Sequence, residues 1–501
     1  MKEGNAVKIL NQITHVCERF GDKTAIKFYG PNGGEISYRS LLEQVHDIAS
    51  RLQSGFGEGQ LIALALPRIP ACIVYMLATL KSGSPFLNLD VKLPLHRIET
   101  ILQRSGASVI VLEENSTIGK DLGLSLDNRK WSDNGLSVYQ LAEGEHKPNH
   151  SLAYVMFTSG SSGEPKGVMV NRNNLDLFAE SITAALSLKN YTSILANASF
   201  SFDISLLESL IALANGMTIH LISDEYVSNP HRIKELIEAG KIDIIQMTPS
   251  QLRLLHKYAK GNLSFLRDVK LCLLGAEAFP EELTNDLLTS VGGDVYNVYG
   301  PTETTIWATS KKVNMNSPIT IGKPIPGYSL SLHDQDGNTV PRGGKGEIWI
   351  SGDAVSDGYI NRDELTAKVF AIHEGERTYK TGDIGVELED GDYKWLGRLD
   401  NQIKIKGKRV ELEEIEIAVK KVQGIENAIV SYHGGSDLVC YYVARDEINE
   451  KYTRDYLTNI LPEYMIPTRY IKMESLPTGI NGKTIRTRIG QSKVGSVANI
   501  S

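Results

Sequence analysis

The chain has 501 residues, of which 41% are hydrophobic and 23% are charged, and its formal net charge is −7. A chain of this length exceeds a single hydrophobic core, so we expect one large domain and at least one smaller domain. The composition excludes a disordered or fibrous chain, and the acidic balance gives no reason to expect nucleic acid as a partner.

The beginning of the chain carries charged residues, Lys2 and Glu3, in place of the apolar stretch of a signal peptide. The best apolar run, residues 69–80, is too short to span a bilayer. The four cysteines lack C-x-x-C spacing, and neither they nor the eleven histidines form a metal-ligand cluster. We therefore expect a cytoplasmic protein without membrane insertion, disulfide scaffold or zinc site.

From residue 60 to about residue 300, short apolar runs alternate with helical patterns, and these runs begin at residues 61, 109, 218, 242, 270 and 294. This alternation predicts largely parallel sheets covered by helices. Between about 316 and 396 the runs are short and broken by Gly, Asp and Pro, which is typical of antiparallel hairpins. This second part is predicted to be a small β subdomain.

The region after Asp400 predicts a helix, because apolar residues recur there at helical spacing: Leu412, Ile415, Val419 and Val422. Two strand-like runs around HGGSD and a further helix follow. The expected fold class is therefore α/β, with a large N-terminal domain (1–399) of parallel α/β sheets that includes the β subdomain. A small α+β C-terminal lid domain (400–501) follows it.

A loop rich in hydroxyls and glycines, with a single lysine, follows the strand-like run 152–157: Thr158, Ser159, Gly160, Ser161, Ser162, Gly163 and Lys166. Small residues let backbone N–H groups approach phosphate oxygens, and the lysine adds a positive charge. Pro165 and Gly167 exclude a Walker loop. The loop alone is compatible with a polyphosphate site or with a flexible linker.

The run TSGSSGEPKG in this loop resembles the phosphate-binding signature of the adenylate-forming superfamily, which includes acyl-CoA synthetases, luciferases and adenylation domains of nonribosomal peptide synthetases. Further runs are similar to the family's core motifs in the expected order: ISYRSLL, LKSGSPFLNLD, FDIS, NVYGPTETT, GEIWISGDAVSDGYI, YKTGD, GRLDNQIKIKGKRVE, LPEYMIP and NGK. The resemblance covers about residues 30–490. It implies an enzyme that uses ATP and Mg²⁺ to make an acyl adenylate.

The resemblance implies a role for each matching residue. Tyr299 would stack on adenine, Asn297 would lie near its amino group, and Glu303 would hold the magnesium. The same run contributes Gly300 and Thr302 to the nucleotide site. On a plain structural interpretation, this stretch is a strand end followed by a proline turn.

Other matches extend the nucleotide site. Asp383 would accept hydrogen bonds from the ribose hydroxyls, and Arg398 would lie near the ribose and phosphates. An adenine-flanking turn is implied at Gly275, Ala276 and Glu277. Their structural alternatives are a strand-ending turn and an exposed charge.

Catalysis is implied for three residues: Lys483, Thr158 and Glu303. Lys483 would reach from the lid to the substrate carboxylate and the α-phosphate, where negative charge converges. Asp400 matches the family's hinge, so the lid would rotate between adenylation and thiol transfer.

The run FDIS separates the branches of the superfamily, because Asp203 matches the aspartate that pairs with the α-ammonium of an amino acid. Alternatively, Ser205 and Glu208 form a capping-box pattern, and Asp203 would only support that helix start. The pocket would be lined by the residues that match substrate positions of peptide synthetases: Asp203, Ile204, Leu207, Gln246, Cys272, Leu274, Val298, Ile306 and Trp307. This set is bulky and without charge around the side chain, which favours glycine, with alanine second.

The expected enzyme is thus an amino acid adenylating ligase that passes its product to the phosphopantetheine thiol of a separate carrier protein, since no carrier segment follows Lys483. Three alternatives stay open. They are an acyl-CoA synthetase for a small carboxylic acid, a D-alanine:carrier-protein ligase, and a nucleotide-binding protein without catalysis. Leu274 stands where D-alanine ligases carry a cysteine, which disfavours that alternative.

Overall fold

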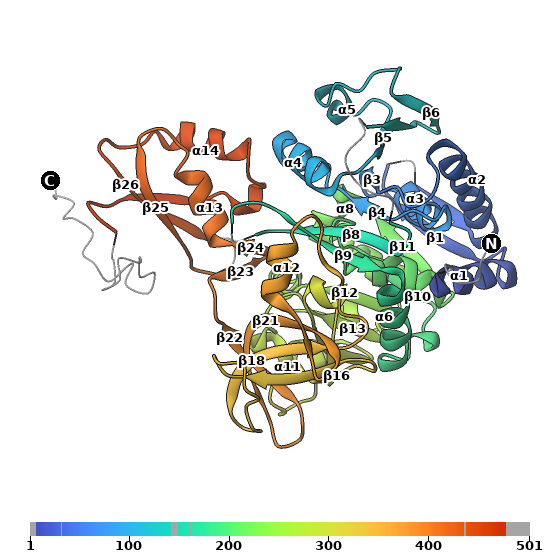
Figure 1. Cartoon of the computed structure of the whole chain (residues 1–501). Helices are drawn as coiled ribbons and strands as arrows, with labels where there is room; N and C mark the ends of the chain where they lie inside the picture. The colour runs from blue at the N-terminus through green and yellow to red at the C-terminus, as the bar shows by residue number, and fades with distance from the viewer. Residues whose placement is uncertain (1–6, 32, 142–148, 161, 435–436, 477–501) are drawn as a thin grey trace. The chain divides into compact units, whose positions relative to one another are not determined.

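The computed structural model describes residues 7–31, 33–141, 149–160, 162–434 and 437–476 (Figure 1). The chain divides into two compact units. Unit 1 consists of Met1–Val91, Ile101–Phe157 and Gly167–Leu399, and unit 2 consists of Lys92–Thr100, Thr158–Lys166 and Asp400–Ser501.

A nine-stranded sheet forms one layer of unit 1. Its order is β16 (Lys323–Pro324), β15 (Thr309–Lys312), β14 (Asp294–Tyr299), β13 (Leu271–Leu274), β12 (Ile244–Met247), β10 (Ser193–Ala196), β11 (Thr218–Ile222), β1 (Thr24–Tyr29) and β2 (Gly34–Ser37). The strands from β14 to β1 are parallel, and the strands at both edges are antiparallel. The predicted β-rich runs at 218, 242, 270 and 294 are therefore confirmed as strands.

An eight-stranded sheet continues the α/β pattern. Its order is β19 (Gly358–Tyr359), β9 (Lys166–Asn171), β8 (Leu152–Thr158), β4 (Phe86–Asn88), β3 (Ile62–Ala65), β5 (Val109–Glu113), β7 (Leu136–Gln140) and β6 (Arg129–Asp133). Strands β8, β4, β3 and β5 are parallel, as the runs at 61 and 109 predict.

The helices that alternate with these strands along the chain are α1 (Lys8–Arg19), α2 (Tyr38–Phe56), α3 (Pro70–Lys81), α4 (Leu95–Ser105), α5 (Thr117–Asp121), α6 (Arg172–Ala185), α7 (Ala212–Ala214), α8 (Asp224–Val227), α9 (Pro230–Gly240), α10 (Pro249–Tyr258) and α11 (Thr284–Ser290). Residues 72–80 of α3 are buried on every side, as expected for a helix that is apolar all round. The main core cluster includes α3 and residues of both sheets, and a second cluster packs on the opposite face of the nine-stranded sheet.

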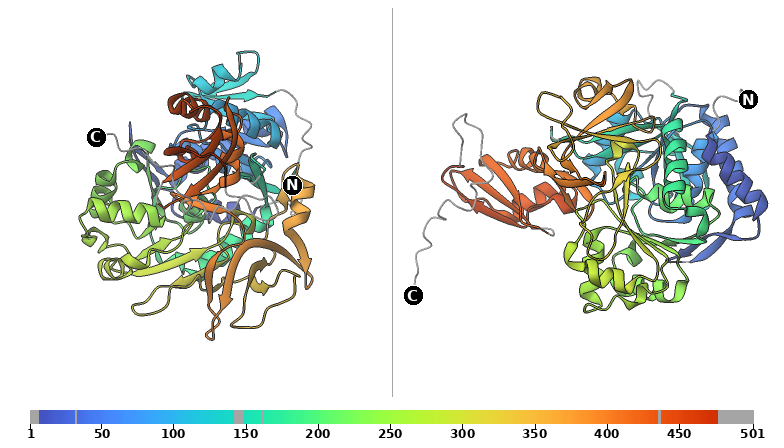
Figure 2. Two further views of the ribbon diagram at one scale, coloured as in Figure 1. Left: turned by 90° about the vertical axis from the view of Figure 1, so that its left-hand side faces the viewer. Right: turned by 90° about the horizontal axis from the view of Figure 1, so that it is seen from below.

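The β subdomain is an antiparallel sheet of β17 (Ser329–His333), β18 (Lys345–Ser351), β21 (Glu376–Glu387), β20 (Phe370–His373) and β22 (Tyr393–Arg398). Figure 2 shows its long strands, in orange, as a curved sheet. Helix α12 (Asp363–Val369) leads into β20. The texture change in the sequence thus corresponds to antiparallel strands within unit 1.

Unit 2 contains a hairpin of β23 (Gln402–Ile405) and β24 (Lys408–Glu411), and a sheet of β25 (Ile425–Tyr432), β26 (Leu438–Ala444) and β27 (Arg469–Lys472). Helices α13 (Leu412–Val419) and α14 (Glu450–Thr458) pack on one face of that sheet, and their apolar residues share one core. The predicted helix ends at Val419, while Val422 lies beyond it in the same core. The expected α/β fold class with a small α+β C-terminal domain is confirmed.

Two further features are the state of the cysteines and the character of the described helices. All four cysteines are buried free thiols. Within the described ranges, no helix combines the length and apolar character needed to cross a membrane.

Candidate functional site

Asp383 on β21 is the centre of a hydrogen-bond cluster in unit 1. Its Oδ2 accepts from the Tyr299 hydroxyl at 2.7 Å, and its Oδ1 accepts from Trp395 Nε1 at 2.9 Å and from Arg398 Nη1 at 3.0 Å. Antiparallel pairing places Asp383 directly opposite Arg398. Three residues of the expected nucleotide site, Tyr299, Asp383 and Arg398, therefore lie together.

The cluster leaves the Asp383 carboxylate with few positions at which it can accept a further hydrogen bond. A carboxylate offers about four acceptor positions, and three are used here. Burial, and then the charge of Asp383, raise the pKa of Tyr299 well above its usual value, so Tyr299 stays a donor. A diol that binds Asp383 through both hydroxyls must displace at least one of these donors.

Asn297 and Glu277 lie at neighbouring strand ends. Asn297 Nδ2 donates to the Thr320 carbonyl at 2.7 Å, so its amide oxygen is the group that can accept from an amino group. Glu277 accepts from the backbone N–H of Ser250 at 2.8 Å and from its hydroxyl, at the first turn of α10. Ala276, which precedes Glu277, has φ of 68°. The expected adenine-flanking turn is thus a tight turn anchored on a helix N-terminus.

Glu303, in the short 3₁₀ turn Thr302–Thr304, is fully buried and accepts from the Tyr359 hydroxyl at 2.6 Å. The described residues contain no group of three or more carboxylate, histidine or cysteine side chains that could hold a metal. Mg²⁺ bound to nucleotide is held mainly by phosphates and water with one or two carboxylates. A single glutamate therefore fits a phosphate-bridging magnesium and does not fit a metal held by protein alone.

The backbone after Glu303 is strained. Thr305 and Ile306 have φ of 56° and 78°, which β-branched residues rarely adopt. The Thr305 hydroxyl donates to the Ala354 carbonyl at 2.6 Å and helps to hold the turn. Gly300 lies against the same turn, and a Cβ there would be 2.5 Å from the Trp307 Cα. The sequence gives no periodic signal for such a turn.

Two of the expected pocket residues, Cys272 and Leu274, lie in a different core cluster from the others. Successive side chains of a strand point to opposite faces, and Cys272 and Leu274 lie in the second core cluster. Four other expected pocket residues belong to the main core cluster: Leu207, Val298, Ile306 and Trp307. Cys272 and Leu274 therefore face away from them.

Leu273 and Gly275 occupy the facing positions instead. Leu273 is buried in the main cluster. A Cβ on Gly275 would be 2.8 Å from Val298 Cγ2 and 3.4 Å from Trp307 Nε1. The alternation along β13 is the signal that would have identified both residues.

The segment after Asp203 also differs from its expected form. Asp203 is 7% exposed. The predicted capping box is absent, because Ser205 Oγ donates to the Phe202 carbonyl and Glu208 accepts from Asn197 and Ala198. The helix is of the π type over η2 (Leu207–Ile211), a form that is frequent at functional sites.

The glycine- and hydroxyl-rich loop belongs to unit 2. A Cβ on Gly160 would be 2.2 Å from the Glu164 carbonyl oxygen, and Gly163 has φ of 81°, so both positions require glycine. Ser159 Oγ donates to the Arg409 carbonyl at 2.8 Å, and no described residue hydrogen-bonds the buried Thr158 Oγ1. The loop is a tight turn, which disfavours the flexible linker.

The remaining expected site residues are Ser161, Lys483 and Asp400. Ser161 and Lys483 lie outside the described residues. Asp400, at the start of the main segment of unit 2, accepts from the Gln402 N–H at 3.1 Å. The sequence missed Trp395 and Tyr359, which hydrogen-bond the two site carboxylates.

Comparison with known proteins identifies related chains. The family described as AMP-binding enzyme matches residues 13–360. The dimodular nonribosomal peptide synthase of Bacillus subtilis (strain 168) is 35% identical over 476 residues, and bacitracin synthase 3 of Bacillus licheniformis is 34% identical over 489 residues. These alignments cover 90% and 93% of this chain but 20% and 7% of the two relatives.

Solved structures share the fold. The Vibrio cholerae adenylation domain AlmE, in complex with glycyl-adenosine-5′-phosphate, matches with a TM-score of 0.85 at 21% identity over 98% of both chains. Holo-AB3403, a four domain nonribosomal peptide synthetase bound to AMP and glycine, matches with a TM-score of 0.68 at 29% identity. That match covers 100% of this chain and 37% of the other.

Proposed function

The chain belongs to the AMP-binding enzymes, and we propose that it activates a small amino acid, with glycine favoured and alanine second. The amino acid carboxylate attacks the α-phosphorus of ATP, which forms an aminoacyl adenylate and releases pyrophosphate. The phosphopantetheine thiol of a separate carrier protein then takes the aminoacyl group and releases AMP. We place this reaction in the cytoplasm.

The close packing around Gly275 is the observation on which the choice of a small substrate rests. Even a methyl group at Gly275 would contact Val298 at 2.8 Å. The neighbouring side chains Leu273 and Trp307 are buried and uncharged, so a charged substrate side chain would be desolvated without a partner. Asp203, five residues before Glu208, supplies the carboxylate for the α-ammonium.

The relatives support the same assignment. Holo-AB3403, which is 29% identical to this chain, is described as bound to AMP and glycine. One curated relative is a dimodular nonribosomal peptide synthase and another is bacitracin synthase 3. The chain spans a fifth or less of these two relatives, so carrier loading is proposed for this region alone.

The nucleotide site would use the residues described above. Tyr299 and Asn297 would take the adenine, and Asp383 with Arg398 would take the ribose. Magnesium, held by Glu303 and the phosphates, would neutralise charge as pyrophosphate leaves. Ser159 and Lys166 would hold the phosphates, as the loop composition predicts.

Lys483 and Asp400 complete the proposed cycle. Lys483 would place its charge between the carboxylate and the α-phosphate in adenylation. Rotation about Asp400 would then present residues 404–408 to the site for thiol transfer. Lys406, with φ of 51°, lies in the tight turn between β23 and β24.

Pyrophosphate exchange with a panel of amino acids and short carboxylic acids tests the proposal. We expect exchange with glycine, weaker exchange with alanine, and none with valine, leucine or phenylalanine. Exchange with carboxylic acids that lack an amino group would favour an acyl-CoA synthetase, and exclusive exchange with D-alanine would favour the carrier-protein ligase. The absence of exchange with every acid would identify a protein without catalysis.

A further inference from the structure

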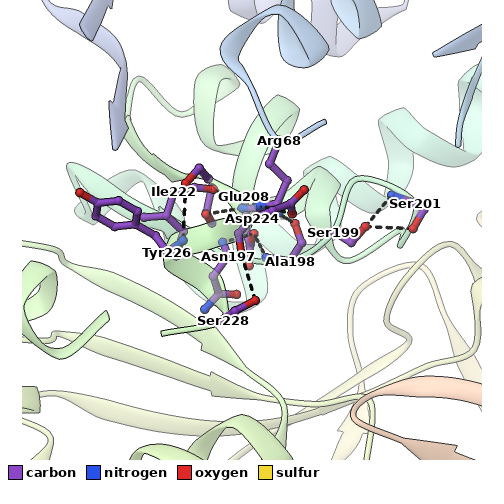
Figure 3. A network of polar contacts seen from close by, with 12 residues as sticks. Arg68, Asn197, Ala198, Ser199, Ser201, Glu208, Ile222, Asp224, Tyr226 and Ser228 are labelled. Carbon is purple, nitrogen blue, oxygen red and sulfur yellow. Dashed lines mark hydrogen bonds and ion pairs between the residues drawn. The ribbon is translucent and has the colours of Figure 1, made fainter. Parts of the chain in front are cut away.

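Two opposite charges are buried around the backbone that follows β10, in unit 1 (Figure 3). The guanidinium of Arg68 donates to the carbonyls of Ala196, Ala198 and Ile222. Glu208 Oε2 accepts from the N–H groups of Asn197, at 2.9 Å, and of Ala198, at 2.8 Å. Within residues 196–198, carbonyl groups therefore bond the positive charge of Arg68 and N–H groups bond the carboxylate of Glu208.

The hydrogen-bond geometry makes Glu208 an acceptor, because N–H groups of Asn197, Ala198 and Gln246 donate to it. Burial raises the pKa of Glu208 to about 7, whereas the charge of Arg68 and the two N–H groups oppose that rise. An ionised carboxylate can accept hydrogen bonds but has no proton to donate. Above pH 7, any group that bonds Glu208 must therefore be a donor.

The second oxygen of Glu208 bonds a residue of the expected pocket. Glu208 Oε1 accepts from Gln246 Nε2 at 3.1 Å. Because the Gln246 Nε2 group bonds Glu208, the amide oxygen of Gln246 points away from Glu208, and an ionised Glu208 favours this orientation of the amide. Asn197 Nδ2 also donates to the Gln246 carbonyl at 3.0 Å, which ties β12 to the same run.

The amide oxygen of Gln246 is then an acceptor that lacks a donor. Gln246 is 2% exposed, and no hydrogen bond from the described residues reaches its Oε1. A buried acceptor of this kind is uncommon in native proteins and indicates a bound group that is not part of the chain. The run 196–198, which bonds Gln246 through Asn197, leads along the chain into the segment that contains Asp203. The Asp203 carbonyl accepts from the Leu206 N–H at 2.9 Å.

We propose that Gln246 Oε1 accepts an N–H of the substrate ammonium, and that Glu208 and Arg68 are positioning residues that hold this acceptor in place. The inference rests on the proposed function, because it requires an amino acid substrate. The ammonium has three donors, and Asp203 does not use them all. Gln246 would thus provide the ammonium with a neutral acceptor in addition to the charged carboxylate of Asp203.

Steady-state pyrophosphate exchange with Gln246→Met tests the contact. This variant keeps the side-chain length and removes the oxygen, without changing the Arg68 contacts. The loss of a hydrogen bond to a charged group corresponds to a rise of about tenfold to a hundredfold in the KM for glycine. The KM for ATP should stay near wild type, whereas the loss of the N–H that bonds the buried Glu208 should lower the melting temperature. Gln60→Met, which removes an oxygen that accepts from the Ser108 hydroxyl, is the matched control and should alter neither KM.

Glu208→Gln tests the positioning role. Its amide can face Gln246 with either end, so the Gln246 oxygen is no longer held toward the substrate. We expect the KM for glycine to rise as in Gln246→Met, and the double variant to show no further rise, because both changes remove the same contact. Loss of the buried charge should lower the melting temperature in either case, so the discriminating readout is the KM for ATP, which a purely structural role would raise together with the KM for glycine.

The outcomes separate the inference from the proposed function. A wild-type enzyme that exchanges with no amino acid overturns both. A wild-type enzyme that exchanges with glycine, together with a Gln246→Met KM for glycine within twofold of wild type, overturns the inference alone and assigns the acceptor to an ordered water. If Glu208→Gln does not fold, Gln246→Met still decides the contact.

Discussion

Replacing Asp383 by Asn should destabilise unit 1 and weaken nucleotide binding together. Asp383 accepts from three donors, Tyr299, Trp395 and Arg398. Its side chain is 10% exposed and that of Arg398 is 14% exposed. Asparagine keeps one acceptor oxygen but brings two amide protons into a site that already contains these donors.

The size of the effect follows from this geometry. Removing one partner of a buried ion pair costs about 3–5 kcal/mol. Asparagine retains part of the hydrogen bonding, so we expect about 2–3 kcal/mol of lost unfolding free energy. If Asp383 also accepts from the ribose, the Kd for ATP should rise about tenfold or more.

The assay combines urea unfolding, followed by tryptophan fluorescence, with ATP titration of the folded variant. Glu387→Gln is the matched control on the same strand, since Glu387 accepts from Arg342 at 2.6 Å but Arg342 is 59% exposed. A surface pair of this kind contributes about 0–1 kcal/mol. The reasoning is refuted if Asp383→Asn is no more destabilising than Glu387→Gln, or if ATP affinity is unchanged.

Three further changes give separate tests. Gly300→Ala places a Cβ 2.5 Å from the Trp307 Cα, so we expect a clear fall in melting temperature from overpacking; Gly34→Ala, with open space at the Cβ, should melt as wild type. Burial lowers the pKa of His220 from 6.5 to about 4, so between these pH values the unfolded chain binds one more proton than the folded chain. Stability is therefore lost as the pH falls from 6.5 to 4, by up to about 3 kcal/mol. His220→Gln should lose less stability between pH 6.5 and pH 4, and equal losses in both proteins would contradict this assignment. Asp400→Pro fixes φ at the proposed hinge, so adenylation and carrier loading, assayed separately, should be impaired unequally; equal impairment argues against a hinge.

The architecture could be predicted from the sequence, because strands and helices of each layer show a periodic pattern of apolar residues. Parallel strands buried on both faces appear as continuous apolar runs, as at 242–247 and 270–274, and these are β12 and β13 with the strands beside them. Motif order was also sufficient to bring Tyr299, Asp383 and Arg398 together.

The lining of the pocket is harder to predict than the fold, because it depends on strand register. A displacement of one residue along β13 exchanges Leu273 for Leu274, and the two point into different cores. The role of Glu208 was also misassigned, since local spacing fits a capping box, whereas the carboxylate bonds backbone groups ten and eleven residues earlier. Such a contact depends on tertiary packing, which spacing along the chain does not encode.

The pairing of β1 with β11 has a consequence for synthesis of the chain. Ile26 lies opposite Ile219 in parallel register, and Thr24 accepts from Thr218, 194 residues later. At about 5–20 residues per second, the ribosome needs about 10–40 s to make the partner of this early strand. During that time the edge of β1 that will pair with β11 has no strand beside it, while the other edge can pair with β2. The nascent segment around β1 is therefore a natural client for chaperones that bind unpaired strands.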